Sequence, residues 1–88
     1  MIKREYKVIS LNGLSSRASV ALVNEANKYD SESTLLFQNE EANMKSIMNV
    51  MALVIRNNEA FAITVDGKDE EKLILGLEKV LRNYKIIE

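Results

Sequence analysis

Histidine, cysteine, tryptophan and proline are all absent from this chain of 88 residues. Without cysteine there is no disulfide bond, no thiol nucleophile and no thiolate metal site. Without histidine there is no base for a Ser-His-Asp or Cys-His arrangement, no imidazole ligand for zinc, and no residue that forms a phosphorylated imidazole. These absences exclude the commonest forms of nucleophilic and metal-assisted catalysis, and we expect no metal site and no cofactor.

An excess of charge of one sign is also missing, because 12 basic residues face 13 acidic ones and the net charge is −1. Proteins that bind nucleic acid directly usually carry a marked positive excess, so direct nucleic-acid binding is not expected. No apolar run approaches the roughly 20 residues of a membrane span, and no segment resembles a signal peptide. Residues 1–88 are predicted to form a single soluble domain, cytoplasmic and without a membrane partner.

The hydrophobic pattern predicts four strands and three helices. The strands are expected at residues 6–11, 34–37, 42–44 and 60–65, where β-forming residues concentrate. The helices are expected at residues 16–27, 47–55 and 70–84, the last with an apolar stripe formed by Leu73, Leu77, Val80, Leu81 and Tyr84. The run 47–55 also fits a buried strand, but its methionines and the preceding serine favour a helix. The order β-α-β-β-α-β-α predicts an α+β domain with helices on one face of an antiparallel sheet.

This order and two local segments resemble the HPr family, the histidine-containing phosphocarriers of the bacterial phosphotransferase system. Residues 12–19 read Asn-Gly-Leu-Ser-Ser-Arg-Ala-Ser and are similar to that family's active-site loop, Gly-Leu/Ile-His-Ala-Arg-Pro-Ala. Residues 43–51 read Asn-Met-Lys-Ser-Ile-Met-Asn-Val-Met and are similar to the Lys-Ser-Ile-Met-Gly-Val-Met segment around the regulatory serine of Gram-positive HPr. Residues 26–30 add a weaker match. The resemblance implies the HPr-like open-faced two-layer sandwich, an antiparallel four-stranded sheet with three helices on one face.

The chain departs from the family where the phosphate is carried. Ser15 stands at the phosphohistidine position, and Ala18 replaces the proline after the arginine. A serine phosphate is a stable ester and a poor phosphate donor, so Ser15 cannot replace histidine in a relay. Ser15 and Ser16 are expected to cap the following helix, and with Arg17 they form a weak candidate site for an anion. The chain is therefore not expected to be an enzyme or a sugar phosphocarrier, and no catalytic residue is assigned.

Ser46 has two interpretations. From spacing alone it is a helix N-cap preceded by Lys45. The resemblance implies that it is the regulatory site phosphorylated by the ATP-dependent HPr kinase/phosphorylase. A phosphate there adds about two negative charges at a helix start, where free N–H groups favour an anion. Asn49 replaces the family's glycine and places a side chain near this site.

The helix after Ser46 is expected to have two faces. Val50, Leu53 and Val54 are expected to face the core. The outward residues are expected to be Ile47, Met48 and Met51, and flexible apolar side chains suit a surface that meets several partners. The resemblance implies that these three, with Arg17 and Lys45, form a partner-binding surface.

The resulting hypothesis is a regulatory protein of carbon catabolite repression, closest in kind to catabolite repression HPr, which also lacks the phosphohistidine. Its implied partners are the kinase and a LacI-type regulator, catabolite control protein A. One alternative is an HPr-fold binding module with neither phosphorylation, which acts through its apolar patch. A third hypothesis, an enzyme built on residues 15–17, needs a base from elsewhere, such as Glu25 or Asp69. Residues 10–14 fit either a turn in a monomer or the hinge of a strand-swapped dimer.

Overall fold

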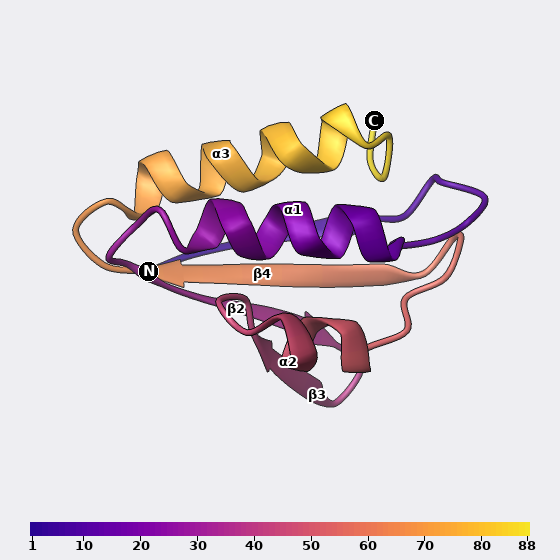
Figure 1. Ribbon diagram of the computed structural model, residues 1–88, viewed down its shortest axis with the longest axis horizontal. Helices are drawn as coiled ribbons and strands as arrows, with labels where there is room; N and C mark the ends of the chain where they lie inside the picture. Colours follow the sequence, from indigo (N-terminus) through magenta and orange to yellow (C-terminus); the bar gives the residue numbers. More distant parts are fainter.

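The computed structural model describes residues 1–88 as an antiparallel sheet covered by helices (Figure 1). The elements are β1 (Ile2–Lys7), α1 (Ser16–Ala26), β2 (Glu32–Phe37), β3 (Glu40–Asn43), α2 (Ile47–Ala52), β4 (Ala60–Asp66) and α3 (Glu70–Asn83). The sheet has the strand order β1-β4-β2-β3, and each neighbouring pair is antiparallel. The predicted α+β class and element order are confirmed. None of the helices is long and apolar enough to cross a membrane.

The core lies between the sheet and the helices, with α1 and α3 packed side by side and α2 against β3 and α1. Alternate residues of the two central strands β2 and β4 point into this layer because side chains of a strand alternate between its faces. The buried strand residues include Leu35, Phe37, Phe61, Ile63 and Val65. They meet the apolar faces of the two long helices. On α1 these are Ala18, Leu22 and Ala26, and on α3 they are Leu73, Leu77 and Leu81, three residues of the predicted stripe. Tyr84 does not complete the predicted stripe, since it is the C-cap of α3 and is exposed.

The first strand lies earlier than predicted. The expected strand covered residues 6–11, whereas β1 pairs with β4 only from Ile2 to Lys7. After Lys7 the chain leaves the sheet, and the N–H of Ile9 donates to the carbonyl of Ile86 at 2.8 Å. The charged residues of β1 concealed it, because an edge strand with one solvated face carries few apolar residues. Two of its inward positions also carry polar groups: Arg4 and Tyr6 both donate to the buried carboxylate of Glu78 on α3.

The second helix is shorter than predicted. It ends at Ala52, and its C-cap, Leu53, already has extended backbone angles, φ −91° and ψ 115°. From there the pattern of burial follows a period of two residues: Leu53 and Ile55 are buried, while Val54 is 64% exposed. The prediction that Val54 faces the core is therefore wrong, because helical spacing no longer applies beyond Ala52.

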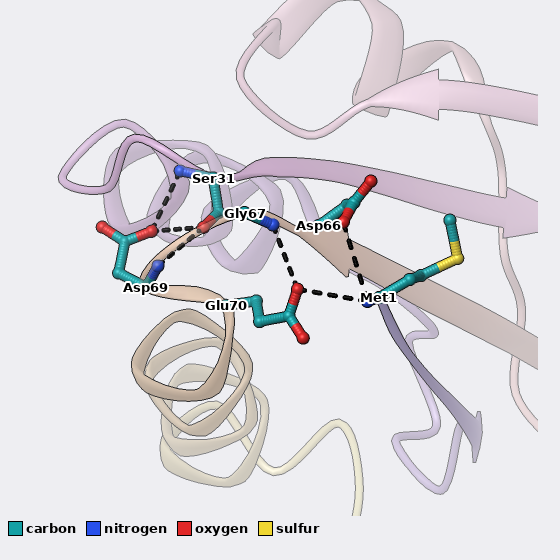
Figure 2. A network of polar contacts seen from close by, with 6 residues as sticks. All are labelled: Met1, Ser31, Asp66, Gly67, Asp69 and Glu70. Carbon is teal, nitrogen blue, oxygen red and sulfur yellow. Dashed lines mark hydrogen bonds and ion pairs between the residues drawn. The ribbon is translucent and has the colours of Figure 1, made fainter.

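The start of α3 is joined to the loop before β2 by a compact polar network (Figure 2). The carboxylate of Asp69 accepts hydrogen bonds from the N–H (3.0 Å) and the hydroxyl of Ser31, whose oxygen accepts in turn from the N–H of Asp69. These hydrogen bonds hold the pKa of the Asp69 carboxyl below its usual value. Glu70 accepts from the N–H of Gly67 at 3.0 Å and pairs with the amino group of Met1 at 3.3 Å. The network fixes the position of α3 relative to the sheet.

Candidate functional site

Ser46 occupies the N-cap of α2, as its spacing predicts. Its hydroxyl oxygen accepts a hydrogen bond from the N–H of Asn49 at 3.3 Å. Its own N–H donates to the carbonyl of Asn43, and its carbonyl accepts from the N–H of Val50. The side chain is only half-buried. The capping bond is long, and it uses the oxygen only as an acceptor, so the hydroxyl proton is free of any bond within the protein.

The residue before Ser46 is tied at each of its polar groups. The N–H of Lys45 donates to Oδ1 of Asn43 at 3.0 Å, and its ammonium donates to the carbonyl of Tyr29 at 2.7 Å. Its carbonyl accepts from Nδ2 of Asn27 at 3.2 Å. The ammonium of Lys45 therefore lies against the segment that follows α1 and does not extend freely into solvent. Asn27 and Tyr29 were not predicted as site residues, although both lie in the segment 26–30 that gave the weakest of the three sequence matches.

Three large apolar side chains are exposed on the helix that Ser46 caps. Met48 is 81% exposed, Met51 45% and Ile47 36%, while Val50 is fully buried. The predicted outward position of the first three and the inward position of Val50 are confirmed. We call Ile47, Met48 and Met51 the α2 patch. Their role as a docking surface stays a prediction at this point.

Ser15 is the N-cap of α1, as predicted. Its oxygen accepts from the N–H of Ala18 at 3.2 Å, and its carbonyl accepts from the N–H of Ser19 at 2.9 Å. Ser16 is the first residue of α1 and its side chain makes no capping hydrogen bond, so the expectation that it also caps the helix is wrong. Ser16 and Arg17 are exposed, and Arg17 makes no ion pair. They border a shallow hollow lined by Ser16, Arg17, Val20, Ala21, Asn24 and Tyr84. At the weak anion site expected at residues 15–17, the guanidinium of Arg17 is unpaired, but no buried polar side chain points to a bound anion. Anion binding there stays a prediction.

The carboxylates that the enzyme hypothesis required lie elsewhere. Glu25 is nine residues along α1 from Ser16, which corresponds to about 13 Å of helix. Its oxygens bind the ammonium of Lys28 and the hydroxyl of Tyr29, each at 3.1 Å. Asp69 is held by Ser31 at the start of α3. Both carboxylates are engaged in these contacts away from Ser15, so neither of the two bases named for the enzyme hypothesis is in place.

Comparison with known proteins agrees with this geometry. A family model described as "PTS HPr component phosphorylation site" matches residues 2–83. The phosphocarrier protein HPr of Mycoplasma capricolum subsp. capricolum is 33% identical over 76 residues, which cover 86% of this chain and 85% of that protein.

Two solved structures extend the comparison over the whole chain. A histidine-containing phosphocarrier protein from Mycoplasma matches with a TM-score of 0.95 at 30% identity, covering 99% of both chains. The Bacillus subtilis catabolite repression protein Crh, described as a dimer with a swapped domain, matches with a TM-score of 0.72 at 25% identity over 100% of both chains. Fold, length and sequence thus agree, and this chain belongs to the HPr family.

Proposed function

We propose that this chain is a regulatory member of the HPr family, switched by phosphorylation of Ser46 and unable to carry phosphate to sugars. A relay needs a phosphorylated group that is labile enough to give its phosphate away, as a phosphoimidazole is. The chain has no histidine. Ser15, at the family's phosphohistidine position, would form a stable ester, and its oxygen already caps α1. The phosphate relay therefore has no residue to pass through.

The observation that carries the proposal is the combination of an accessible N-cap serine with the exposed α2 patch around it. HPr kinase/phosphorylase would transfer the γ-phosphoryl group of ATP to Oγ of Ser46. The new Oγ–P bond replaces the P–O bond to ADP, and the hydroxyl proton passes to a base of the kinase. The modification adds about two negative charges beside Met48 and Met51. The surface would then be apolar when Ser46 is unmodified, and would combine apolar side chains with an anionic group when Ser46 is phosphorylated.

The partner that fits this switch is a LacI-type catabolite control regulator. The α2 patch would supply apolar contact area, and the phosphate would pair with cationic side chains of the regulator. Arg17 is exposed and unpaired, so it can bind an acidic group of the same partner. Lys45 precedes Ser46 and so lies at the edge of this surface. Its ammonium already donates to the carbonyl of Tyr29, so Lys45 is not expected to pair freely with the partner.

The proposal is tested by intact mass after incubation with HPr kinase/phosphorylase and ATP. The wild type is expected to gain one phosphoryl group, Ser15→Ala to gain the same one, and Ser46→Ala to gain none. Incubation with phosphoenolpyruvate and the first enzyme of the phosphotransferase relay is expected to add nothing. Full labelling of Ser46→Ala by the kinase would show that the site is misassigned.

The second candidate is an HPr-fold binding module that is not phosphorylated at all. Asn49 favours it, because its exposed side chain stands where the family's glycine leaves room for a kinase. Such a module would act through the α2 patch in a single state. Titration of the regulator with the unmodified and the phosphorylated chain separates the candidates. Equal affinities favour the constitutive module, and tighter binding of the phosphorylated form favours the switch.

A further inference from the structure

The helix that presents Ser46 is too short to hold it in place alone. α2 has six residues, and Val50 is the only one of them that is buried. Isolated helices shorter than about 12 residues are marginal in water, so most of their order comes from contacts with the rest of the protein. The hydrogen bonds made by Ser46 itself are all local, to Asn43, Asn49 and Val50. The position of its hydroxyl must therefore depend on ties from another element.

Those ties come from the end of α1. Asn27, the C-cap of α1, donates from Nδ2 to the carbonyl of Val23 at 2.9 Å and to the carbonyl of Lys45 at 3.2 Å. A carboxamide nitrogen has two N–H donors, so both bonds form at once. The Lys45 carbonyl belongs to the planar peptide group that leads into Ser46. One side chain thus joins an 11-residue helix directly to the peptide before the serine.

We propose that Asn27 is a positioning residue for the phosphorylation of Ser46. It acts through the Lys45 carbonyl and touches neither the hydroxyl nor the phosphate donor, and the bond from Lys45 to Tyr29 supports it. The inference rests on the proposed function, since it concerns the rate at which Ser46 takes up phosphate. Without the Asn27 donor, the segment before α2 samples more orientations, and fewer of them align Oγ for attack. Docking through the α2 patch is unaffected, so the turnover number falls and KM for the protein stays constant.

The test is steady-state phosphorylation by HPr kinase/phosphorylase with ATP, at a temperature where circular dichroism shows each variant folded. Asn27→Ala removes the carboxamide, and Asn27→Asp keeps its shape without a donor. Both are expected to lower kcat about tenfold at unchanged KM, because misplacement of a reacting group is costly. Asn83→Ala is the matched control, since this exposed asparagine also lies at a helix end but makes no side-chain hydrogen bond. It is expected to match the wild type.

A second measurement needs no kinase. Amide hydrogen exchange should show about tenfold lower protection of Asn49 and Val50 in Asn27→Ala, with Leu77 in α3 unchanged. Wild-type kcat in both Asn27 variants, or protection lost equally in α2 and α3, would overturn the positioning role. A wild-type chain that takes up no phosphate would instead refute the proposed function, and the exchange data would still decide whether Asn27 orders the Ser46 segment.

Discussion

Two buried serines near the start of β2 have opposite polar environments. Ser31 is 2% exposed and Ser33 3% exposed. The hydroxyl of Ser31 exchanges hydrogen bonds with Asp69, as Figure 2 shows. The hydroxyl of Ser33 is buried on the helix side of the sheet, like Leu35 two residues on, and has no hydrogen-bond partner. A buried hydroxyl without a partner keeps the cost of leaving water and gains nothing in return.

Replacement of these serines should therefore change stability in opposite directions. Ser33→Ala is expected to raise the free energy of unfolding by about 1 kcal/mol, because it removes an unpaired polar group. Ser31→Ala is the matched control and is expected to lower it by about 1–3 kcal/mol, because the Asp69 carboxylate loses a donor. Urea unfolding at pH 7 measures both. A destabilised Ser33→Ala protein would mean that this hydroxyl has a partner, such as a bound water molecule.

At the residue scale, the sequence predicted the site residues whose role depends on their near neighbours in the chain, and missed those whose partners lie far away in the sequence. The N-cap positions of Ser15 and Ser46 were predicted because a cap depends on the three residues that follow it. Asn27 and Tyr29 were missed because their partner, Lys45, lies 18 and 16 residues away. Asp69 was considered as a possible base for residues 15–17, and its actual partner, Ser31, was missed because it lies 38 residues earlier in the chain and no local pattern links the two.

The close approach of two helices depends on a glycine. Gly76 lies in the middle of α3, and a side chain added there would meet the carboxylate of Glu25 on α1 and, at 3.1 Å, the hydroxyl of Tyr29. That carboxylate accepts the hydroxyl of Tyr29 at 3.1 Å. Glycine costs a helix about 1 kcal/mol relative to alanine. Glycine at this position therefore lowers the intrinsic stability of α3, but it leaves room for the Glu25 carboxylate of α1 to pack against the helix.

Alanine at position 76 should have an effect that depends on Glu25. In the wild type, Gly76→Ala is expected to lower the free energy of unfolding by about 1 kcal/mol, because it displaces the Glu25 carboxylate. In a Glu25→Ala background the carboxylate is gone and the Tyr29 hydroxyl, no longer bound to it, can move aside, so the same change is expected to raise the free energy of unfolding by about 0.5–1 kcal/mol through helix propensity. A double-mutant cycle in urea measures the coupling. The same sign in both backgrounds would contradict the packing argument.

At the element scale, the long helices were predicted closely and the irregular segments were not. α1 and α3 bury a regular apolar face, and their bounds fell within one residue of prediction. β1 was misplaced because two of its inward residues, Arg4 and Tyr6, carry polar groups, and the carboxylate that accepts their hydrogen bonds, Glu78, lies more than 70 residues away. The apolar run 47–55 was ambiguous because it contains both structures: a helix to Ala52, then an extended segment.

At the scale of the whole molecule, one strongly curved loop keeps β1 in its own chain. Residues 8–14 lead from the edge strand back to α1, and several hydrogen bonds hold this loop to the segment before β4. They include Leu14 N–H to the Ile55 carbonyl at 2.9 Å and Asn57 Nδ2 to the Ser10 carbonyl at 3.1 Å. Gly13 has a φ of +69°, and a side chain there would collide with the Ile55 carbonyl. The closed loop therefore requires glycine at this position.

Strain at Gly13 should convert the monomer into a strand-exchanged dimer. If residues 10–14 straighten, β1 can pair with β4 of a second copy, keeping the same ladder while the closed turn disappears. We expect the wild type to be monomeric, and Gly13→Ala to form a dimer whose share rises with protein concentration, measured by light scattering after size exclusion. Gly67→Ala, strained at φ +152° but remote from the hinge, should lose stability and stay monomeric. If Gly13→Ala is destabilised but remains monomeric, the strain relieved by straightening the loop is smaller than the entropy lost when two chains associate, and the prediction is wrong.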